Sequence, residues 1–463
     1  MVRTEKDLLG ERELPGAAPW GIHTLRAYEN FPPALGPVHP ALIRALIRVK
    51  RACARTNAEL GFLDADRAAA IDAACVRLLA DPPSDAFPLD ALQGGAGTST
   101  NMNLNEVIAN LALDHMGRPR GDYAVLDPLD HVNLHQSTND VYPTALKIAA
   151  LEALRELGGV CAGLQGILQQ REKDFAALVI PASTERVDAV PITLGAQFGS
   201  FSEAVARDRW RTVKCTERLR TVNLGGTAVG TGLTAPREYI FRVVEKLREE
   251  TGLALARGEN LMDQTANTDA FVEVSGILKA CACNLIKLSD DLRLLSQREF
   301  ILLPPVQAGS SIMPGKVNPV LLEYAIQAGL KVQANDLLVA DCASRGSLQI
   351  CEFLPLLGHA LLESLTILTV VIKRLTPFVG GIRAQPERCR TALDHSLGLF
   401  AVWVPEVGYA QAGIWAAEYV ADPQGSVRDF LTKKLGSARV AEALTSERLT
   451  ALGFVADPKG GVR

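Results

Sequence analysis

The sequence predicts a mostly α-helical fold built around a bundle of long helices. Apolar residues recur every three or four positions through several long segments, and this spacing lines up one face of a helix. Alternation of apolar and polar residues, which would indicate strands, is scarce. Long helices must bury their apolar faces against one another or against a partner chain, so an elongated bundle is expected.

Four segments show the helical spacing most clearly. The first runs from Pro191 to Val222, and the second carries an apolar stripe from Phe271 to Leu292. The third and fourth extend from Leu321 to Leu338 and from Leu357 to Leu375. The most apolar stretch, which starts at Phe353, is interrupted by proline, histidine and glutamate. It is therefore predicted to be a buried core helix and not a membrane span.

Clusters of proline and glycine divide the chain into three predicted domains. Stretches such as NFPPALGPVHP, DPPSD and LLPPVQAGSS interrupt the helical pattern and mark connections. We expect an N-terminal domain at residues 1–129, a central helical-bundle domain at 130–375 and a small C-terminal helical domain at 376–463.

The composition is typical of a globular protein that handles small molecules. The 463 residues are 48% hydrophobic and 22% charged, and 48 basic against 52 acidic side chains give a net charge of -4. No basic stripe predicts binding to nucleic acid or to an anionic membrane. The charged N-terminus lacks the apolar region of a secretory signal, so a cytoplasmic location is expected. The nine scattered cysteines are predicted to be reduced core residues without a disulfide or a metal site.

Three polar segments place hydroxyl and amide side chains ahead of helices. In the first, Gln93–Asn110, a glycine-rich turn delivers Thr98 to a helix start, where N–H groups and hydroxyls can face an anion. The second places Ser137, Thr138 and Asn139 ahead of a helix, and the third does the same with Thr184. Each segment alone is explained equally well as a helix cap.

The loop VQAGSSIMPGKVNPVLLEY, from Val306 to Tyr324, adds two serines, a lysine and an asparagine between two glycines. Lys316 can meet one carboxylate, while neutral donors can bind a second one with a smaller desolvation cost. The same donors would stabilise the dianion that forms when a proton is removed beside a carboxylate. The whole set therefore suits a small dicarboxylate.

These segments resemble blocks of the aspartase/fumarase superfamily. GSSIMPGKVNP is similar to the characteristic loop of that family, and GTSTNMNLNEVIAN, QSTNDVYPTA and NLGGTAVGTGL are similar to its other blocks in the same order. The similarity extends from about residue 5 to about residue 420. Ala96 stands where fumarases usually carry serine, which favours the aspartate ammonia-lyase branch.

The resemblance implies a three-domain, mostly α-helical chain whose central helices assemble into a homotetramer with active sites shared between subunits. It implies a carbon-nitrogen lyase that converts L-aspartate to fumarate and ammonia by anti elimination, without a metal or organic cofactor. The implied partners are the small dicarboxylate or amino-dicarboxylate substrate and other copies of the chain.

By the same resemblance, Ser310 is the general base that removes the C3 proton. The neighbouring carboxylate, in its aci-carboxylate form, would be bound by Thr98, Ser137, Thr138 and Ser311. Lys316 and Asn318 would hold the other carboxylate, and Asn139 and Thr184 would face the leaving amino group. A serine hydroxyl is almost wholly protonated near neutral pH, so the loop must stabilise an alkoxide-like Ser310 and close over the substrate.

One departure from the family pattern concerns the leaving group. Family members usually carry histidine or glutamine where this chain has Glu185, and the glutamate that pairs with the fumarase histidine corresponds to Glu323. Two close carboxylates share a proton or hold a cation between them, so Glu185 is predicted to favour a cationic leaving group. The alternative is a surface ion pair between Glu185 and Arg186.

Further departures leave the exact substrate open. His135 is unusual at its position and is interpreted as a packed histidine close to the site, and Val402 and Trp403 replace a common Thr-Ala pair. Aspartate ammonia-lyase is the leading function. The alternatives are a related lyase acting on an N-substituted aspartate or another fumarate-forming acid, then class II fumarate hydratase, then a catalytically silent structural homologue.

Overall fold

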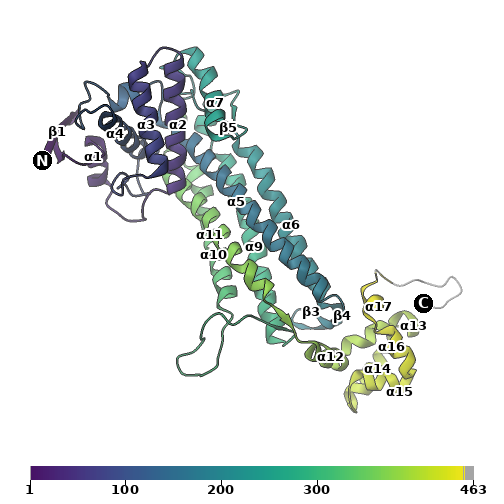
Figure 1. Cartoon of the computed structure of the whole chain (residues 1–463). Helices are drawn as coiled ribbons and strands as arrows, with labels where there is room; N and C mark the ends of the chain where they lie inside the picture. Colours follow the sequence, from purple (N-terminus) through teal and green to yellow (C-terminus); the bar gives the residue numbers. More distant parts are fainter. Residues whose placement is uncertain (1, 452, 454–463) are drawn as a thin grey trace. The chain divides into compact units, whose positions relative to one another are not determined.

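The computed structural model, which describes residues 2–451 and 453, confirms the mostly α-helical fold (Figure 1). The first group of helices is α1 (Ile22–Asn30), α2 (Pro40–Glu59), α3 (Ala65–Ala80), α4 (Thr98–His115), the π-helix η1 (Pro128–Val132), α5 (Thr138–Asp174) and α6 (Leu194–Leu219). The second is α7 (Arg237–Thr251), α8 (Leu261–Ala266), α9 (Asp269–Gln297), α10 (Val320–Ser344) and α11 (Leu354–Gly380). The last is α12 (Pro386–His395), the 3-10 helix η2 (Leu397–Trp403), α13 (Val404–Val407), α14 (Tyr409–Ala421), α15 (Val427–Leu435), α16 (Ser437–Ala443) and α17 (Ser446–Thr450).

The strands are short and form four two-stranded sheets within the described residues. The antiparallel pairs are β1 (Val2–Asp7) with β2 (Gly10–Pro15), β3 (Val179–Thr184) with β4 (Val187–Thr193), and β7 (Ile301–Leu302) with β8 (Arg383–Ala384). The parallel pair is β5 (Thr221–Val222) with β6 (Ala256–Arg257).

Two local expectations from the sequence were wrong at the β3–β4 hairpin. Pro191 was expected inside a helix, but it lies in β4 opposite Pro181, and α6 begins only at Leu194. Thr184 was expected directly ahead of that helix, but it ends β3. The physical reason is that pairing with β3 across a tight hairpin satisfies the backbone of this segment, whereas a helix would have to accommodate a proline.

Two compact units make up the chain, and each contains three separate stretches of sequence. Unit 1 comprises Met1–Gly158, Trp210–Ala282 and Leu330–Thr369, and unit 2 comprises Gly159–Arg209, Cys283–Gly329 and Val370–Arg463. Because α5, α9, α10 and α11 each contribute residues to both units, these units differ from consecutive domains. The division into three domains stays a prediction.

In unit 1, α2 packs against α3 and α7, and α3 packs against α4 (Figure 1). The sequence of α2 explains its start, because Pro40 stands at the first helical position and the Ala41 N–H donates to Nδ1 of His39 at 3.2 Å. One face of α2 carries Leu46 and Ile47, which are fully buried with Ile71 of α3. This packing fixes the helices on which the polar segments of unit 1 are mounted.

In unit 2, the small helices near the C-terminus surround a core that includes Trp403, Leu399 and Leu431 (Figure 1). This helical group contacts the β3–β4 hairpin through α12, η2 and α17. The approach of η2 is so close that a side chain at Gly398 would meet the carbonyl oxygen of Ala189 at 2.0 Å. The hairpin is therefore supported by tertiary packing over most of its length.

Helix α11 is long and apolar enough to cross a membrane, with a mean hydropathy of 1.7 in its most apolar window. However, 67% of that window is buried within the protein, as is usual for a core helix. The nine cysteines are free thiols, and all except Cys283 are buried.

Candidate active site

The glycine-rich turn before α4 exposes Thr98, the first residue of that helix. Gly97 immediately before it has a φ of 91°, and an added Cβ would lie 2.4 Å from the ring of Tyr142, so only glycine fits this position. The turn is held from inside by Gln93, whose Oε1 accepts from the Thr100 N–H at 3.1 Å and from the Thr100 hydroxyl at 2.9 Å. The structure thus presents the Thr98 side chain at the surface on a rigid helix start.

The segment from Gln136 to Asn139 is anchored by buried side chains of other helices. Lys50 of α2, with no exposed surface, donates from Nζ to Gln136 Oε1 at 2.9 Å and to Asn133 Oδ1 at 2.8 Å. Burial lowers the pKa of Lys50 to about 7. Asn101 of α4 donates from Nδ2 to Thr138 Oγ1 at 3.1 Å, so this hydroxyl is held in place but can still donate to a ligand.

Asn139 is oriented by the loop that follows β5. Its Nδ2 donates to the backbone carbonyl oxygen of Ala228 at 2.7 Å, and the backbone carbonyl oxygen of Asn139 accepts from Asn223 Nδ2 at 2.8 Å. A carbonyl oxygen can only accept, so the amide NH₂ must face Ala228 and Oδ1 of Asn139 points elsewhere. An exposed amide oxygen is an acceptor suited to an ammonium group.

His135 lies just before this segment in a left-handed conformation, with a φ of 60°. Its Nδ1 is 2.7 Å from Asn57 Oδ1, and its ring packs edge-on against Phe62 and tilted against Tyr239. Partial burial lowers the pKa of His135, which favours the neutral ring.

In unit 2, Thr184 and Glu185 lie at the tip of the β3–β4 hairpin, and both are exposed. Thr184 pairs with Val187, so Glu185 and Arg186 form a two-residue turn with φ values of 53° and 66°. Such a turn usually contains glycine or asparagine, and two bulkier residues in the left-handed region are strained. No ion pair of Glu185 with Arg186, or contact with Glu323, occurs among the described residues.

The serine loop comprises residues Gly309 to Asn318. Two hydrogen bonds join its two ends, and we call this junction the neck of the loop. The Gly309 N–H donates to the Lys316 carbonyl at 2.8 Å, and Asn318 Nδ2 donates to the Gly309 carbonyl at 2.7 Å. In Figure 1 it belongs to the long connection between β7 and α10, at the lower left. Asn318 therefore closes the loop with one amide N–H and retains the other.

Within the serine loop, the Ser310 oxygen accepts two backbone hydrogen bonds. The N–H of Met313 lies 2.8 Å from Oγ, and that of Ile312 lies 3.2 Å from it. Donors at this distance stabilise negative charge on oxygen more than a neutral hydroxyl, so they favour a deprotonated Ser310. Lys316 is exposed on the same loop and forms no ion pair with any described residue.

A substitution at Gly309 tests the neck of the serine loop. An added Cβ would lie 2.7 Å from the Asn318 backbone nitrogen and 2.8 Å from the Lys316 carbonyl oxygen. Gly309→Ala is expected to open the neck, displace Ser310 and lower kcat/KM by roughly tenfold to a hundredfold in steady-state assays. Gly276→Ala in α9 is the control, because its Cβ would meet nothing within 4 Å. Equal activity of both variants would contradict a role of the neck.

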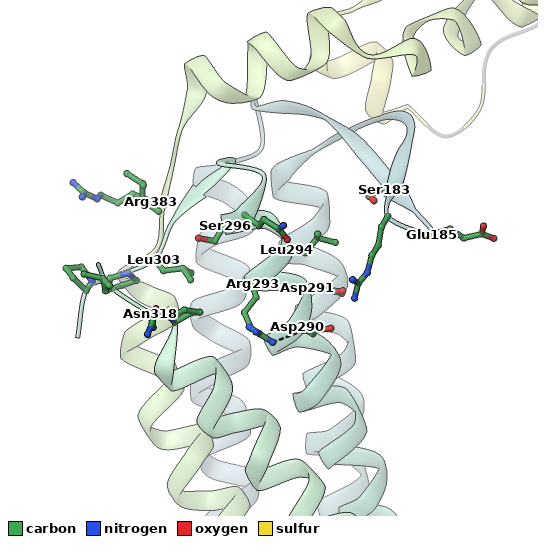
Figure 2. Close-up of a pocket in the computed structure, with 17 residues that line it drawn as sticks. Ser183, Glu185, Asp290, Asp291, Arg293, Leu294, Ser296, Leu303, Asn318 and Arg383 are labelled. Carbon is green, nitrogen blue, oxygen red and sulfur yellow. Dashed lines mark hydrogen bonds and ion pairs between the residues drawn. The ribbon is translucent and has the colours of Figure 1, made fainter. Parts of the chain in front are cut away.

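Unit 2 also contains a cavity of about 910 Å³ near the hairpin and the end of the serine loop. Figure 2 shows Asn318 on one side of it and Glu185 on the other, with the Glu185 side chain extended away from the cavity. Arg293 donates to Asp290 at 3.1 Å in its wall. Ser310 and Lys316 are not among the described lining residues, so the cavity by itself is not the predicted site.

The predicted residues therefore fall into two sets. Unit 1 holds Thr98, Ser137, Thr138 and Asn139, and unit 2 holds Thr184, Glu185, Ser310, Ser311, Lys316, Asn318 and Glu323. Sequence reasoning missed the supporting residues Lys50, Asn101 and Asp140, as well as the backbone donors to Ser310. The available signal for Lys50 was its spacing, because it falls in register with the apolar positions Leu46 and Cys53 of α2.

The helical fold and the serine loop define a lyase of the aspartase/fumarase type. The sequence pattern of the family described as lyase matches residues 10–334, and the chain belongs to this family.

Among characterised relatives, the chain is similar to two bacterial aspartate ammonia-lyases. It is 41% identical to that of a Bacillus species over 423 residues, which cover 90% of each chain. It is 40% identical to that of Escherichia coli K12 over 442 residues, which cover 94% of this chain and 92% of the relative.

Solved structures agree with this placement. A Brucella melitensis structure titled as fumarate lyase:delta crystallin bound to cobalt superposes with a TM-score of 0.92 at 42% identity, covering 97% of this chain and 99% of that one. A class II fumarase from Schistosoma mansoni superposes with a TM-score of 0.91 at 27% identity, covering 96% and 98%.

Proposed function

We propose that this protein is a carbon-nitrogen lyase that converts L-aspartate into fumarate and ammonia. The observation that carries the proposal is the serine loop, in which two backbone N–H groups donate to Ser310 Oγ. The same loop contains Lys316, which forms no ion pair with a described residue. Identity of 40 to 41% with aspartate ammonia-lyases over at least 90% of the chain supports the same reaction.

The proposed mechanism begins with removal of a proton from C3 by Ser310. The electron pair of the C–H bond moves onto the adjacent carboxylate, which becomes an aci-carboxylate dianion bound by Thr98, Ser137, Thr138 and Ser311. The dianion then collapses, the C2–N bond breaks, and a carbon-carbon double bond forms as ammonia leaves. Preorganised neutral donors stabilise the dianion more than the starting carboxylate, which lowers the barrier.

The other end of the substrate would be fixed by charge. Lys316 and Asn318 hold the second carboxylate, and Asn139 and Thr184 face the amino group. The orientation of Asn139 supports this role, because its amide oxygen is left to accept from an ammonium. The chemistry needs no group beyond these side chains, so we propose a cofactor-free reaction.

The active assembly is proposed to be a cytoplasmic homotetramer with shared active sites. Large apolar side chains remain uncovered on the long helices of a single chain, such as Trp210 of α6, 68% exposed, and Leu337 of α10, 72% exposed. The serine loop also exposes apolar side chains, with Ile312 at 83%. Surfaces of this kind are usually covered by another chain or by closure over a ligand.

The function is tested by incubating the purified protein with fumarate and either ammonium, water alone or a panel of amines, and identifying products by mass spectrometry. Aspartate formation from ammonium is the expected result. Malate from water alone would indicate a fumarate hydratase, and an N-substituted aspartate as the main product would indicate a lyase for a larger amine. No product with any partner would reject the enzymatic proposal in favour of a silent homologue.

A second candidate, a lyase for an N-substituted aspartate, is favoured by the exposed carboxylate of Glu185. Glu185→Gln removes a negative charge that would attract a cationic leaving group, so kcat/KM for aspartate is expected to fall relative to malate by about tenfold. The ranking of kcat/KM for aspartate, malate and N-methylaspartate checks this. Arg186→Gln at the same turn is the matched control, and an unchanged ranking in Glu185→Gln would reject the role of Glu185.

A further inference from the structure

Asp140, the residue after Asn139, is a buried carboxylate for which the mechanism above has no use. It has no exposed surface and accepts three backbone hydrogen bonds. The Ser137 N–H donates to Oδ1 at 3.0 Å, while the N–H groups of Gly225 and Thr227 donate to Oδ2 at 3.1 and 3.0 Å. One side chain thus joins the carboxylate-binding segment to the loop that follows β5.

That loop is the one that orients Asn139. The carbonyl of Ala228, next to Thr227, receives the Asn139 amide at 2.7 Å. Thr227 is buried with a φ of 54°, a left-handed conformation that is strained for a β-branched residue. A strained conformation persists only when its surroundings hold it, and Asp140 accepts a hydrogen bond from the N–H of this residue.

We propose that Asp140 is a positioning residue that fixes Ser137 and, through the Thr227–Ala228 backbone, aims the amide oxygen of Asn139 at the substrate amino group. This inference rests on the proposed function. Ser137 and Asn139 are only partly buried, and Asp140 is a buried anchor that ties their backbone to the loop after β5. The positioning role applies to substrate binding and to departure of the amino group, and proton removal by Ser310 is separate from it.

The protonation state of Asp140 matters, because a carboxylate accepts the three N–H donors more strongly than a neutral carboxyl group does. Burial raises its pKa to about 6, against the opposing effect of those donors and of the Lys50 ammonium. The titratable groups that face it are Lys50 and Cys53 on α2 and Tyr239 on α7, which are also buried. Below pH 6 the protonated carboxyl is the weaker acceptor, so its hydrogen bonds from Ser137, Gly225 and Thr227 weaken as the pH falls.

The test is Asp140→Asn in the full-length protein, assayed for aspartate deamination across pH 5 to 8. Asparagine keeps the volume but turns an NH₂ toward backbone N–H groups. KM for aspartate is expected to rise at least about tenfold, and the acid limb, which is the increase of the wild-type KM below about pH 6, is expected to disappear. Protonation of the general base Ser310 would lower kcat instead. The substrate carboxylates titrate near pH 4 or below, so they do not produce that limb.

Glu106→Gln is the matched control. Glu106 of α4 is another buried carboxylate in unit 1, and it accepts hydrogen bonds from the backbone N–H groups of Gly21 and His23 at the start of α1. It is expected to lower thermal stability and to leave KM and the acid limb unchanged. A KM within twofold of wild type in Asp140→Asn, with the acid limb intact, would overturn the inference. If that variant does not fold, the wild-type profile decides, because a KM for aspartate that stays constant between pH 5 and 7 would also overturn the inference. Wild-type protein without any lyase activity would instead reject the proposed function.

Discussion

Ser310→Ala is expected to lower kcat for aspartate deamination by about a thousandfold or more. General-base catalysis contributes about 10² to 10⁴ to a rate, and Ser310 is the residue of the serine loop to which we assign removal of the C3 proton. The Met313 and Ile312 N–H groups that now donate to Oγ lie in an exposed loop, so water can replace their partner in the variant. Steady-state kinetics and isothermal titration with aspartate would measure the loss of kcat and the retained affinity.

Two controls distinguish loss of the general base in Ser310→Ala from a general loss of structure. Ser200→Ala removes an exposed hydroxyl from α6 that donates to the Gln197 carbonyl and accepts from the Gln197 side-chain amide, and it should leave kcat unchanged. Sedimentation should give the same assembly for both variants and the wild type. Residual turnover above a tenth of the wild-type value in Ser310→Ala would reject Ser310 as the base.

Lys316→Met is expected to lower kcat/KM by about a hundredfold, mainly through KM. A charge-assisted hydrogen bond to a carboxylate contributes about 1.5–3 kcal/mol, and tenfold in affinity corresponds to about 1.4 kcal/mol. Lys316 has no ionic partner among the described residues, so its ammonium is available to a ligand and its loss leaves no buried charge behind. Initial-rate kinetics over a wide range of aspartate concentrations would measure the effect.

The control for Lys316 is Lys434→Met, which removes the same charge from α15, where the lysine pairs with Glu418. This variant should keep kcat/KM within about twofold, since exposed ion pairs contribute about 1 kcal/mol or less to stability. Lys316→Arg should recover only part of the activity, because the planar guanidinium does not match the position of the ammonium. Equal kinetics for Lys316→Met and Lys434→Met would remove Lys316 from the substrate site.

The helices and the hairpin show what local sequence can and cannot predict. The apolar spacing from Leu321 to Leu338 and from Leu357 to Leu375 predicts α10 and α11, because a helix is defined by contacts a few residues apart. The spacing from Pro191 to Val222 extended the predicted helix into β4, since the apolar spacing of this segment does not report its pairing with β3 across the hairpin. The left-handed turn at Glu185 and Arg186 could not be predicted from the sequence either, because glutamate and arginine are not typical of such turns.

For the candidate site, the sequence by itself determined which chemical groups are present and which family loop carries them, because GSSIMPGKVNP and the polar segments are contiguous strings. Only the tertiary structure decided what each group bonds to. It shows two backbone donors on Ser310, an Asn139 amide turned by Ala228, and buried Lys50 and Asp140 behind the carboxylate-binding segment. Ala228 and Lys50 lie far along the chain from the residues they bond, so packing brings those partners together. The donors to Ser310 are only two and three residues away, and the conformation of the loop decides whether they reach it.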